Sequence, residues 1–259
     1  MLKFFRTIRK KLIEEDNVRK YLLYAIGEIL LVVIGILIAL QVNNWNEARK
    51  ERNKEAYYIS ELIIDLEKNY VEAKTNSRFS KKQSSNASLL LMSIENQNRE
   101  LKNSDWFIAL MHTWFLPHPT YSSKTWNELN STGELVLLRN KEVTRSISDY
   151  YDNIEHINVL EKEWGEFNLK YRYMVNSLVE PPLRDSVFTY LGFTGEGPGY
   201  SDAPDHTTYV NQLQNIDGVT GILSDIKINR TASAISHDNL LAANCKILGM
   251  LKQEYSLLK

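Results

Sequence analysis

The sequence predicts an all-α protein, in which one N-terminal transmembrane helix continues into a long helix and a helical bundle follows. Three observations favour this class. The 259 residues include 11 Gly and 6 Pro, below the usual shares of about 7% and 5%, which disfavours turn-rich β architectures. Leu22–Val42 is an apolar run with one charged residue, Glu28. Residues 43–116 contain neither Gly nor Pro, so nothing obvious ends a helix there.

Residues 1–20 form a basic cytoplasmic segment in this interpretation. They hold seven basic and three acidic side chains, whereas residues 43–55, beyond the apolar run, hold four basic ones. The positive-inside rule therefore places the N-terminus in the cytoplasm and the bulk of the chain across the membrane. Phe5, Ile8 and Leu12 share one helical face, which predicts an amphipathic helix on the membrane surface. A plain topology signal is the alternative.

Residues 21–45 are expected to form the transmembrane helix. About 20 apolar residues at 1.5 Å each cover the ~30 Å hydrocarbon core of a bilayer. Tyr21 and Tyr24 at one end, and Trp45 at the other, stand where aromatic rings favour the membrane interfaces. The run is longer than that of a signal peptide and lacks a cleavage site, so it should remain as an anchor. A buried helix of a soluble protein, the alternative, rarely runs this long without a polar stripe.

One face of the transmembrane helix carries small and polar residues. At 100° per residue, the following four lie on that face: Glu28, Gly35, Ala39 and Asn46. Because small residues let two helices approach closely, we expect self-association through this face and hence a homo-oligomer. Two other interpretations of Glu28 remain: the carboxylate snorkels to the nearby interface, or it belongs to a proton or ion pathway.

Residues 46–259 are expected to form a periplasmic helical domain. An alternation of three and four residues, from Ile59 to Leu101, predicts that the long helix gives one side of a bundle. Its Ser-rich middle, Asn76–Ser88, is predicted either to bend or to be hydrated, and a break there would make two helices. Further helices are predicted at 105–111, 123–129, 140–178, 205–213 and 232–258. Gly and Pro residues mark one loop, at 190–206.

No catalytic, cofactor or metal motif is recognisable in the sequence. The five histidines lack metal-ligand spacing, and Walker, GxGxxG and GxSxG motifs are absent. Two groups are weak candidates for a ligand or partner site: Trp106, Trp114 and Trp126 in an aromatic stretch, and Asp202, Asp205 and His206 in the loop. Core packing is the favoured interpretation of the first group, and helix capping with solvated charges that of the second.

Composition excludes some classes of protein. A formal net charge of -1 gives no basic excess, so we expect no nucleic-acid partner. The single cysteine, Cys245, cannot form an internal disulfide and excludes a zinc site built from several cysteines.

The anchor carries a recognisable pattern. The residues that carry it are Tyr24-Ala-Ile-Gly-Glu-Ile29 and the exit Leu40-Gln-Val-Asn-Asn-Trp-Asn-Glu47, with a weaker likeness at 126–138 and 150–154. In these segments the chain resembles a domain-of-unknown-function family of single-span proteins of Gram-negative bacteria. The resemblance implies an inner-membrane anchor and a helical periplasmic part, and it implies no activity and no catalytic residues.

We therefore expect a membrane-anchored helical binding, scaffold or sensor protein of the cell envelope, not an enzyme. Its expected partners are the lipid bilayer, further copies of the chain and an envelope protein. Two alternatives remain: a membrane-tethered enzyme or small-ligand-binding domain that uses the candidate residues above, and a subunit of an ion- or proton-conducting complex centred on Glu28.

Overall fold

The computed structural model describes residues 18–95, 101–191 and 203–258. The chain divides into two compact units, Met1–Tyr57 and Tyr58–Lys259. Every regular element among the described residues is a helix, as the sequence predicts. The basic segment expected at residues 1–20 lies outside the described residues, except for its last three positions, which begin helix α2 (Val18–Ile94).

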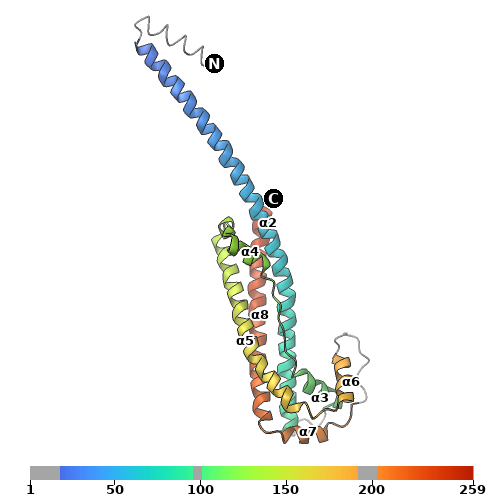
Figure 1. The fold of residues 1–259 in the computed structure, drawn as a ribbon. Helices are drawn as coiled ribbons and strands as arrows, with labels where there is room; N and C mark the ends of the chain where they lie inside the picture. The colour runs from blue at the N-terminus through green and yellow to red at the C-terminus, as the bar shows by residue number, and fades with distance from the viewer. Residues whose placement is uncertain (1–17, 96–100, 192–202, 259) are drawn as a thin grey trace. The chain divides into compact units, whose positions relative to one another are not determined.

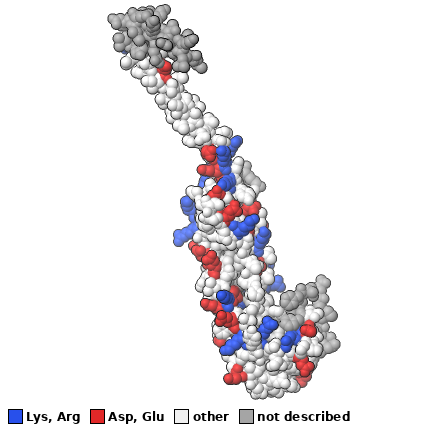
Figure 2. All heavy atoms as spheres, in the orientation of Figure 1, with Lys and Arg blue, Asp and Glu red and all other residues white. Residues whose placement is uncertain are grey.

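The apolar stretch of α2 belongs to the first unit. Every Leu, Ile and Val side chain between Leu22 and Val42 is at least 46% exposed, and this is the one helix among the described residues that is long and apolar enough to cross a membrane. Figure 2 shows the stretch almost wholly without charged side chains, whereas both signs of charge are interspersed over the visible face of the second unit. The first unit therefore presents to its surroundings a surface that water does not favour.

The second unit is a bundle of three long helices. The part of α2 from Tyr58 onward lies with α5 (Lys141–Val175) and α8 (Val219–Leu258) (Figure 1). Shorter helices cover its ends, and they are α3 (Asn103–His112), α4 (Lys124–Thr132), the 3-10 helix η1 (Glu134–Leu137), α6 (Pro181–Leu191) and α7 (Thr207–Gln214). The predicted long helix is continuous, with no break in its Ser-rich middle.

Two hydrophobic clusters make up the core of this unit. One joins Tyr58–Ala73 of α2 to Leu129 of α4 and to the apolar faces of α5 and α8. The other joins Ala87–Ile94 of α2 to α3, α6, α7 and the opposite ends of α5 and α8. The periodic apolar residues that predicted the long helix, such as Leu62, Leu66 and Leu90, are fully buried. Amphipathicity therefore accounts for the packing of all three long helices.

A polar layer separates the two clusters. Most buried side chains between them are polar, and they come from all three long helices: Asn76, Ser77, Ser80, Gln83 and Asn86 on α2, Glu161 and Asn168 on α5, and Arg230, Ser233 and His237 on α8. The Ser-rich middle of α2 thus stays helical, and one side of it faces the interior while residues such as Ser85 are exposed. The polar side chains on the buried side lie inside the bundle, where each needs a hydrogen-bond partner.

Local sequence signals predict two of the helix ends correctly and one helix start wrongly. Asn140 caps α5, because its side chain accepts hydrogen bonds from the backbone N–H groups of Glu142 and Val143. Gly133 ends α4 with a left-handed φ of 71°. The expected start of the last helix near Ala232 is wrong, since α8 begins at Val219 directly after Gly218, whose φ is 74°.

Other boundaries also differ from the sequence prediction. The long helix expected to reach residue 178 ends at Val175. The prolines after it open α6, because a proline in the first turn of a helix removes an N–H that has no partner there anyway. The predicted loop at 190–206 overlaps the end of α6, and residues 192–202 lie outside the described residues.

Candidate functional site

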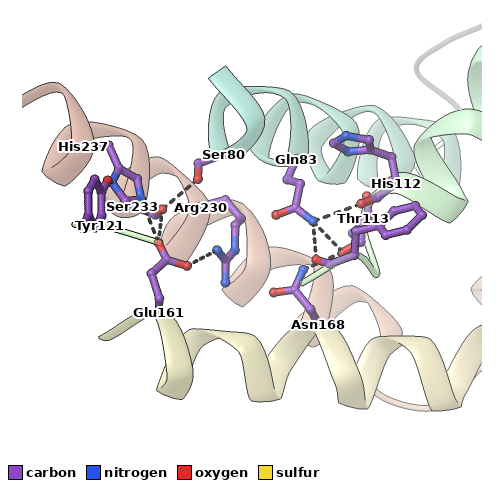
Figure 3. Close-up of polar contacts among 11 residues, drawn as sticks. Ser80, Gln83, His112, Thr113, Tyr121, Glu161, Asn168, Arg230, Ser233 and His237 are labelled. Atoms are coloured by element: carbon purple, nitrogen blue, oxygen red, sulfur yellow. Dashed lines mark hydrogen bonds and ion pairs between the residues drawn. The ribbon is translucent and has the colours of Figure 1, made fainter. Parts of the chain in front are cut away.

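Glu161 of α5 is at the centre of the polar layer. The residue is 5% exposed. Oε2 accepts a hydrogen bond from Arg230 Nη1 at 2.6 Å, and Oε1 accepts one from the Ser233 hydroxyl (Figure 3). His237 Nε2 lies 3.5 Å from Oε1. An acid on α5 is thereby held by a cation, a hydroxyl and an imidazole that all come from α8.

Two further residues extend this arrangement, which we call the Glu161 network. The hydroxyl oxygens of Ser80 on α2 and Ser233 on α8 are 2.8 Å apart. The hydroxyl of Tyr121, from the segment between α3 and α4, lies 2.8 Å from His237 Nδ1. The six residues of the Glu161 network, Ser80, Tyr121, Glu161, Arg230, Ser233 and His237, therefore connect α2, α5, α8 and that segment inside the bundle.

The surroundings decide the protonation of the network. Burial alone would raise the pKa of Glu161, but the His237 contact, the charge of Arg230 and the Ser233 hydroxyl lower it below its usual value, so the carboxyl is ionised at neutral pH. Burial raises the pKa of Tyr121 far above its usual range. An ionised carboxylate only accepts hydrogen bonds, and the neutral Tyr121 hydroxyl can donate one to His237 Nδ1.

A pocket of 490 Å³ lies beside this network. One face of α5, including Glu161, lines it, together with Leu116–Pro119 from the segment between α3 and α4. That segment approaches α5 closely at Gly165, where an added Cβ would stand 3.2 Å from Leu116 Cδ2. The volume falls within the range of about 300–1,000 Å³ that is typical of small-molecule pockets. The pocket therefore has a rigid, hydrogen-bonded acid in its wall.

Two amides fix the same segment to the bundle. Gln83 Nε2 of α2 donates to the backbone carbonyls of His112 at 3.0 Å and Phe115 at 2.7 Å. Asn168 Nδ2 of α5 donates to the Thr113 carbonyl at 2.6 Å. α3 ends here, so its last carbonyls lack the usual helical partners; His112 O accepts from Phe115 N–H at 3.3 Å, and the side-chain amides supply further donors.

The three candidate tryptophans do not form one site. Trp106 is fully buried and its indole N–H donates to Ser93 Oγ at 3.0 Å. Trp114 is 4% exposed and lies against the guanidinium groups of Arg172 and Arg184, 5.6 and 5.9 Å from the ring centre. Trp126 stacks on Tyr151 with ring centroids 5.5 Å apart, at the other end of the bundle.

The loop candidates Asp205 and His206 have different partners and do not form one site. Asp205 Oδ1 accepts hydrogen bonds from the N–H and the hydroxyl of Thr207, which opens α7, and the first of these lowers the pKa of the exposed Asp205. His206 stacks with Trp106 at 6.0 Å and its Nδ1 lies 2.5 Å from Asn103 Oδ1. The two predicted regions thus meet at Trp106 and His206. Asp202 lies outside the described residues, and within the described ones no cluster of His, Cys, Asp or Glu suits a metal ion.

The predicted association face of α2 has open surroundings within its unit. Gly35 has no atom within 4 Å of an added Cβ, and Ala39 is exposed. Glu28 and Asn46 are half-buried, and Asn46 Oδ1 accepts a hydrogen bond from Arg49 at 3.3 Å. Self-association through this face stays a prediction.

Sequence reasoning did not single out the Glu161 network. A signal was present, since Arg230, Ser233 and His237 continue the spacing of three and four residues that relates Ile226 to Leu240 on the buried face of α8. Glu161 likewise follows Ile157 by four residues on the buried face of α5. Polar residues on the apolar face of an amphipathic helix mark a buried polar site, because such residues are buried only when partners satisfy them.

Comparison with known proteins adds one match. Residues 28–97 match a family of unknown function, DUF6090. The match begins in the apolar stretch and runs past the end of α2, so it includes Ser80 and Gln83 of the polar layer but none of the layer residues on α5 and α8. It agrees with the resemblance to an uncharacterised family. No curated protein and no solved structure matches the chain.

Proposed function

We propose that this protein is a membrane-anchored helical binding protein of the bacterial cell envelope, acting as a scaffold or sensor. Its anchor is the apolar stretch of α2 in the inner membrane, with the N-terminus in the cytoplasm and residues 46–259 in the periplasm. The observation that carries the proposal is the exposure of Leu22–Val42, where every Leu, Ile and Val side chain is at least 46% exposed.

The physical argument rests on the cost of that exposure in water. Burial of a Leu, Ile or Val side chain is worth about 1.5–3 kcal/mol, and the described part of the chain covers none of this stretch. Lipid provides the missing apolar environment, and a single helix satisfies its own backbone hydrogen bonds there. The excess of basic residues before the stretch supports the orientation, and the family resemblance supports the choice of membrane.

The second unit supports binding rather than catalysis. Glu161, in the wall of the pocket, is held ionised by Arg230 and Ser233, which prevents it from acting as a general acid at neutral pH. An acid fixed in this way can instead orient a ligand or a partner side chain that enters the pocket. We therefore assign the pocket a recognition role.

The single cysteine provides a direct test of topology. Cys245 is exposed on α8, so a membrane-impermeant maleimide should label it in cells whose outer membrane alone has been permeabilised. The matched control replaces Cys245 by Ser and Thr7 by Cys, and it should be labelled only after the inner membrane is lysed. Labelling of Thr7→Cys before lysis, or protection of Cys245 until lysis, contradicts the proposed orientation.

A second experiment tests binding. The full chain is crosslinked in native membranes, purified and analysed for proteins that co-purify in stoichiometric amounts. Asn158→Trp fills the pocket, whereas Val159→Trp places the same side chain at an exposed position of α5 outside the pocket lining. We expect a partner with the wild type and with Val159→Trp, and its loss with Asn158→Trp. Equal recovery with both variants, or no partner with any chain, contradicts a recognition role for the pocket.

A further inference from the structure

We infer that the polar layer binds ordered water inside the bundle, between Arg230 of α8 and the side-chain oxygens of Gln83 on α2 and Asn168 on α5. The site shares Arg230 with the Glu161 network, and none of its three residues lines the pocket. The inference concerns the interior of the second unit and does not depend on the proposed function.

The donors of this site belong to Arg230. Its side chain is fully buried, and a guanidinium carries five N–H donors. Nη1 donates to Glu161, but Nε and Nη2 have no hydrogen-bond partner in the described part of the chain. A buried donor without a partner destabilises the folded state, and a charged one does so more. These two nitrogens carry three N–H groups on one fully buried cation, and they need acceptors.

The acceptors are two side-chain amide oxygens. Gln83 Oε1 and Asn168 Oδ1 are buried and likewise lack a partner among the described residues. Their orientation is not ambiguous, because each amide nitrogen donates to backbone carbonyls at the end of α3 and a flipped amide would set oxygen against oxygen. Figure 3 shows both oxygens on the side of their amides that faces Arg230. Donors and acceptors thus face one another across the interior of the bundle.

Water fits this site better than an ion does. An anion suits the guanidinium but is repelled by the two amide oxygens, and a cation suits the oxygens but is repelled by Arg230. A water molecule donates to an oxygen and accepts from an N–H at the same time, and buried waters in proteins typically make about three such bonds to groups without other partners. The bound water would therefore link α2, α5 and α8 at one level of the bundle.

The first test is a crystal structure of the full chain in detergent. We expect solvent density within about 3.2 Å of Arg230 Nε or Nη2 that also lies within that distance of Gln83 Oε1 or Asn168 Oδ1. Direct hydrogen bonds from Arg230 to either amide oxygen, without intervening density, overturn the inference. A bromide anomalous peak at the site after exchange of chloride for bromide also overturns it, because it identifies a halide.

The second test works in solution on the wild-type chain. With ¹⁵N-labelled arginine in detergent micelles, we expect the Arg230 Nε–H proton to exchange slowly with bulk solvent. At the ¹⁵N frequency of Arg230 Nε, we also expect a cross-peak between this proton and water. The Arg230 signal is assigned by its disappearance in Arg230→Lys. The water contact itself is measured on the wild-type chain. Absence of the water cross-peak, or a chloride-dependent shift of the signal, contradicts a water site.

Discussion

The carboxylate of Glu161 lies 2.6 Å from Nη1 of Arg230, and this ion pair between α5 and α8 is almost completely withdrawn from solvent. The side chains are 4% and 0% exposed, whereas the pair between Lys252 and Glu67 in the same unit is more than half exposed on both sides. The two pairs share similar distances, 2.6 and 2.8 Å. Their energetic roles differ, because only the buried pair has been taken out of water.

The buried ion pair predicts an asymmetric response to mutation. Arg230→Met leaves the Glu161 carboxylate buried without its cation, and we expect the free energy of unfolding to fall by about 3–5 kcal/mol. Replacing both residues by Met removes the unpaired charge, so the double variant should be more stable than Arg230→Met alone. Denaturant unfolding of the full chain in detergent measures both effects.

The exposed pair provides the control for this prediction. Lys252→Met removes a pair that solvent screens, so its effect should stay within about 1 kcal/mol. If Arg230→Met costs no more than Lys252→Met, the buried pair does not contribute to stability in the way its geometry indicates.

His112 predicts a specific dependence of stability on pH. Burial, with the nearby charge of Lys82, lowers the pKa of this imidazole to about 4. In the unfolded chain the pKa returns to about 6.5, so the unfolded state binds the proton first. The stability is complete above about pH 6.5 and is lost progressively as the pH falls from there through about 4. The loss amounts to at most about 3 kcal/mol.

A variant isolates this contribution. His112 packs against the rings of Phe79 and Phe115, at centroid distances of 4.8 and 6.2 Å, so His112→Phe keeps the aromatic contacts and removes the titration. Stability measured between pH 4 and 7 should be flatter in His112→Phe than in the wild type. The exposed His118→Gln should leave the wild-type slope unchanged, and an equal slope in all three chains would show that His112 does not titrate as described.

Gly165 predicts a steric limit at the pocket. An added Cβ would stand 3.2 Å from Leu116 Cδ2, so the larger side chain of Gly165→Leu must displace the segment between α3 and α4. We expect a loss of about 1–3 kcal/mol from overpacking. Gly249→Leu is the matched control, because Gly249 is exposed on α8 with no atom within 4 Å of its Cβ position. Thermal unfolding of the two variants should separate them, and equal midpoints would count against close packing at Gly165.

The predicted association face in the apolar stretch of α2 gives a prediction of site-specific crosslinking. In a chain with Cys245→Ser, oxidation of Ala39→Cys in native membranes should give a covalent dimer. Leu37→Cys lies on the opposite face, since two residues turn a helix by about 200°, and it should remain monomeric. Monomer at both positions, or equal dimer at both, contradicts self-association through the face that contains Gly35 and Ala39.

Much of the fold could be predicted because the signals are local and periodic. The apolar run from Leu22 to Val42, the long α2 helix, the Asn140 cap and the Gly133 stop each depend on a few neighbouring residues. The sequence pattern predicts the start of α8 near residue 232, more than three turns after its start at Val219. Gly221 and the polar residues near Arg230 weaken the apolar pattern there. Pro181 was interpreted only as a stop, although it also opens α6.

The candidate site was much less predictable. The tryptophans stood out by residue type, yet Trp106, Trp114 and Trp126 pack in separate places. Glu161, Arg230 and His237 look like ordinary surface residues when each is considered alone. Only their position on the buried faces of α5 and α8 distinguishes them, and that position depends on how the helices rotate against one another.

The sequence alone determined the helical class, the apolar segment and the amphipathic faces of the long helices, because each follows from the order of residues along a single helix. The tertiary structure decided which polar residues face one another: it set Glu161 against Arg230, Ser80 against Ser233, and the Gln83 and Asn168 oxygens toward Arg230. These partners come from helices that lie far apart in the chain, so their contacts arise only when packing brings the helices together.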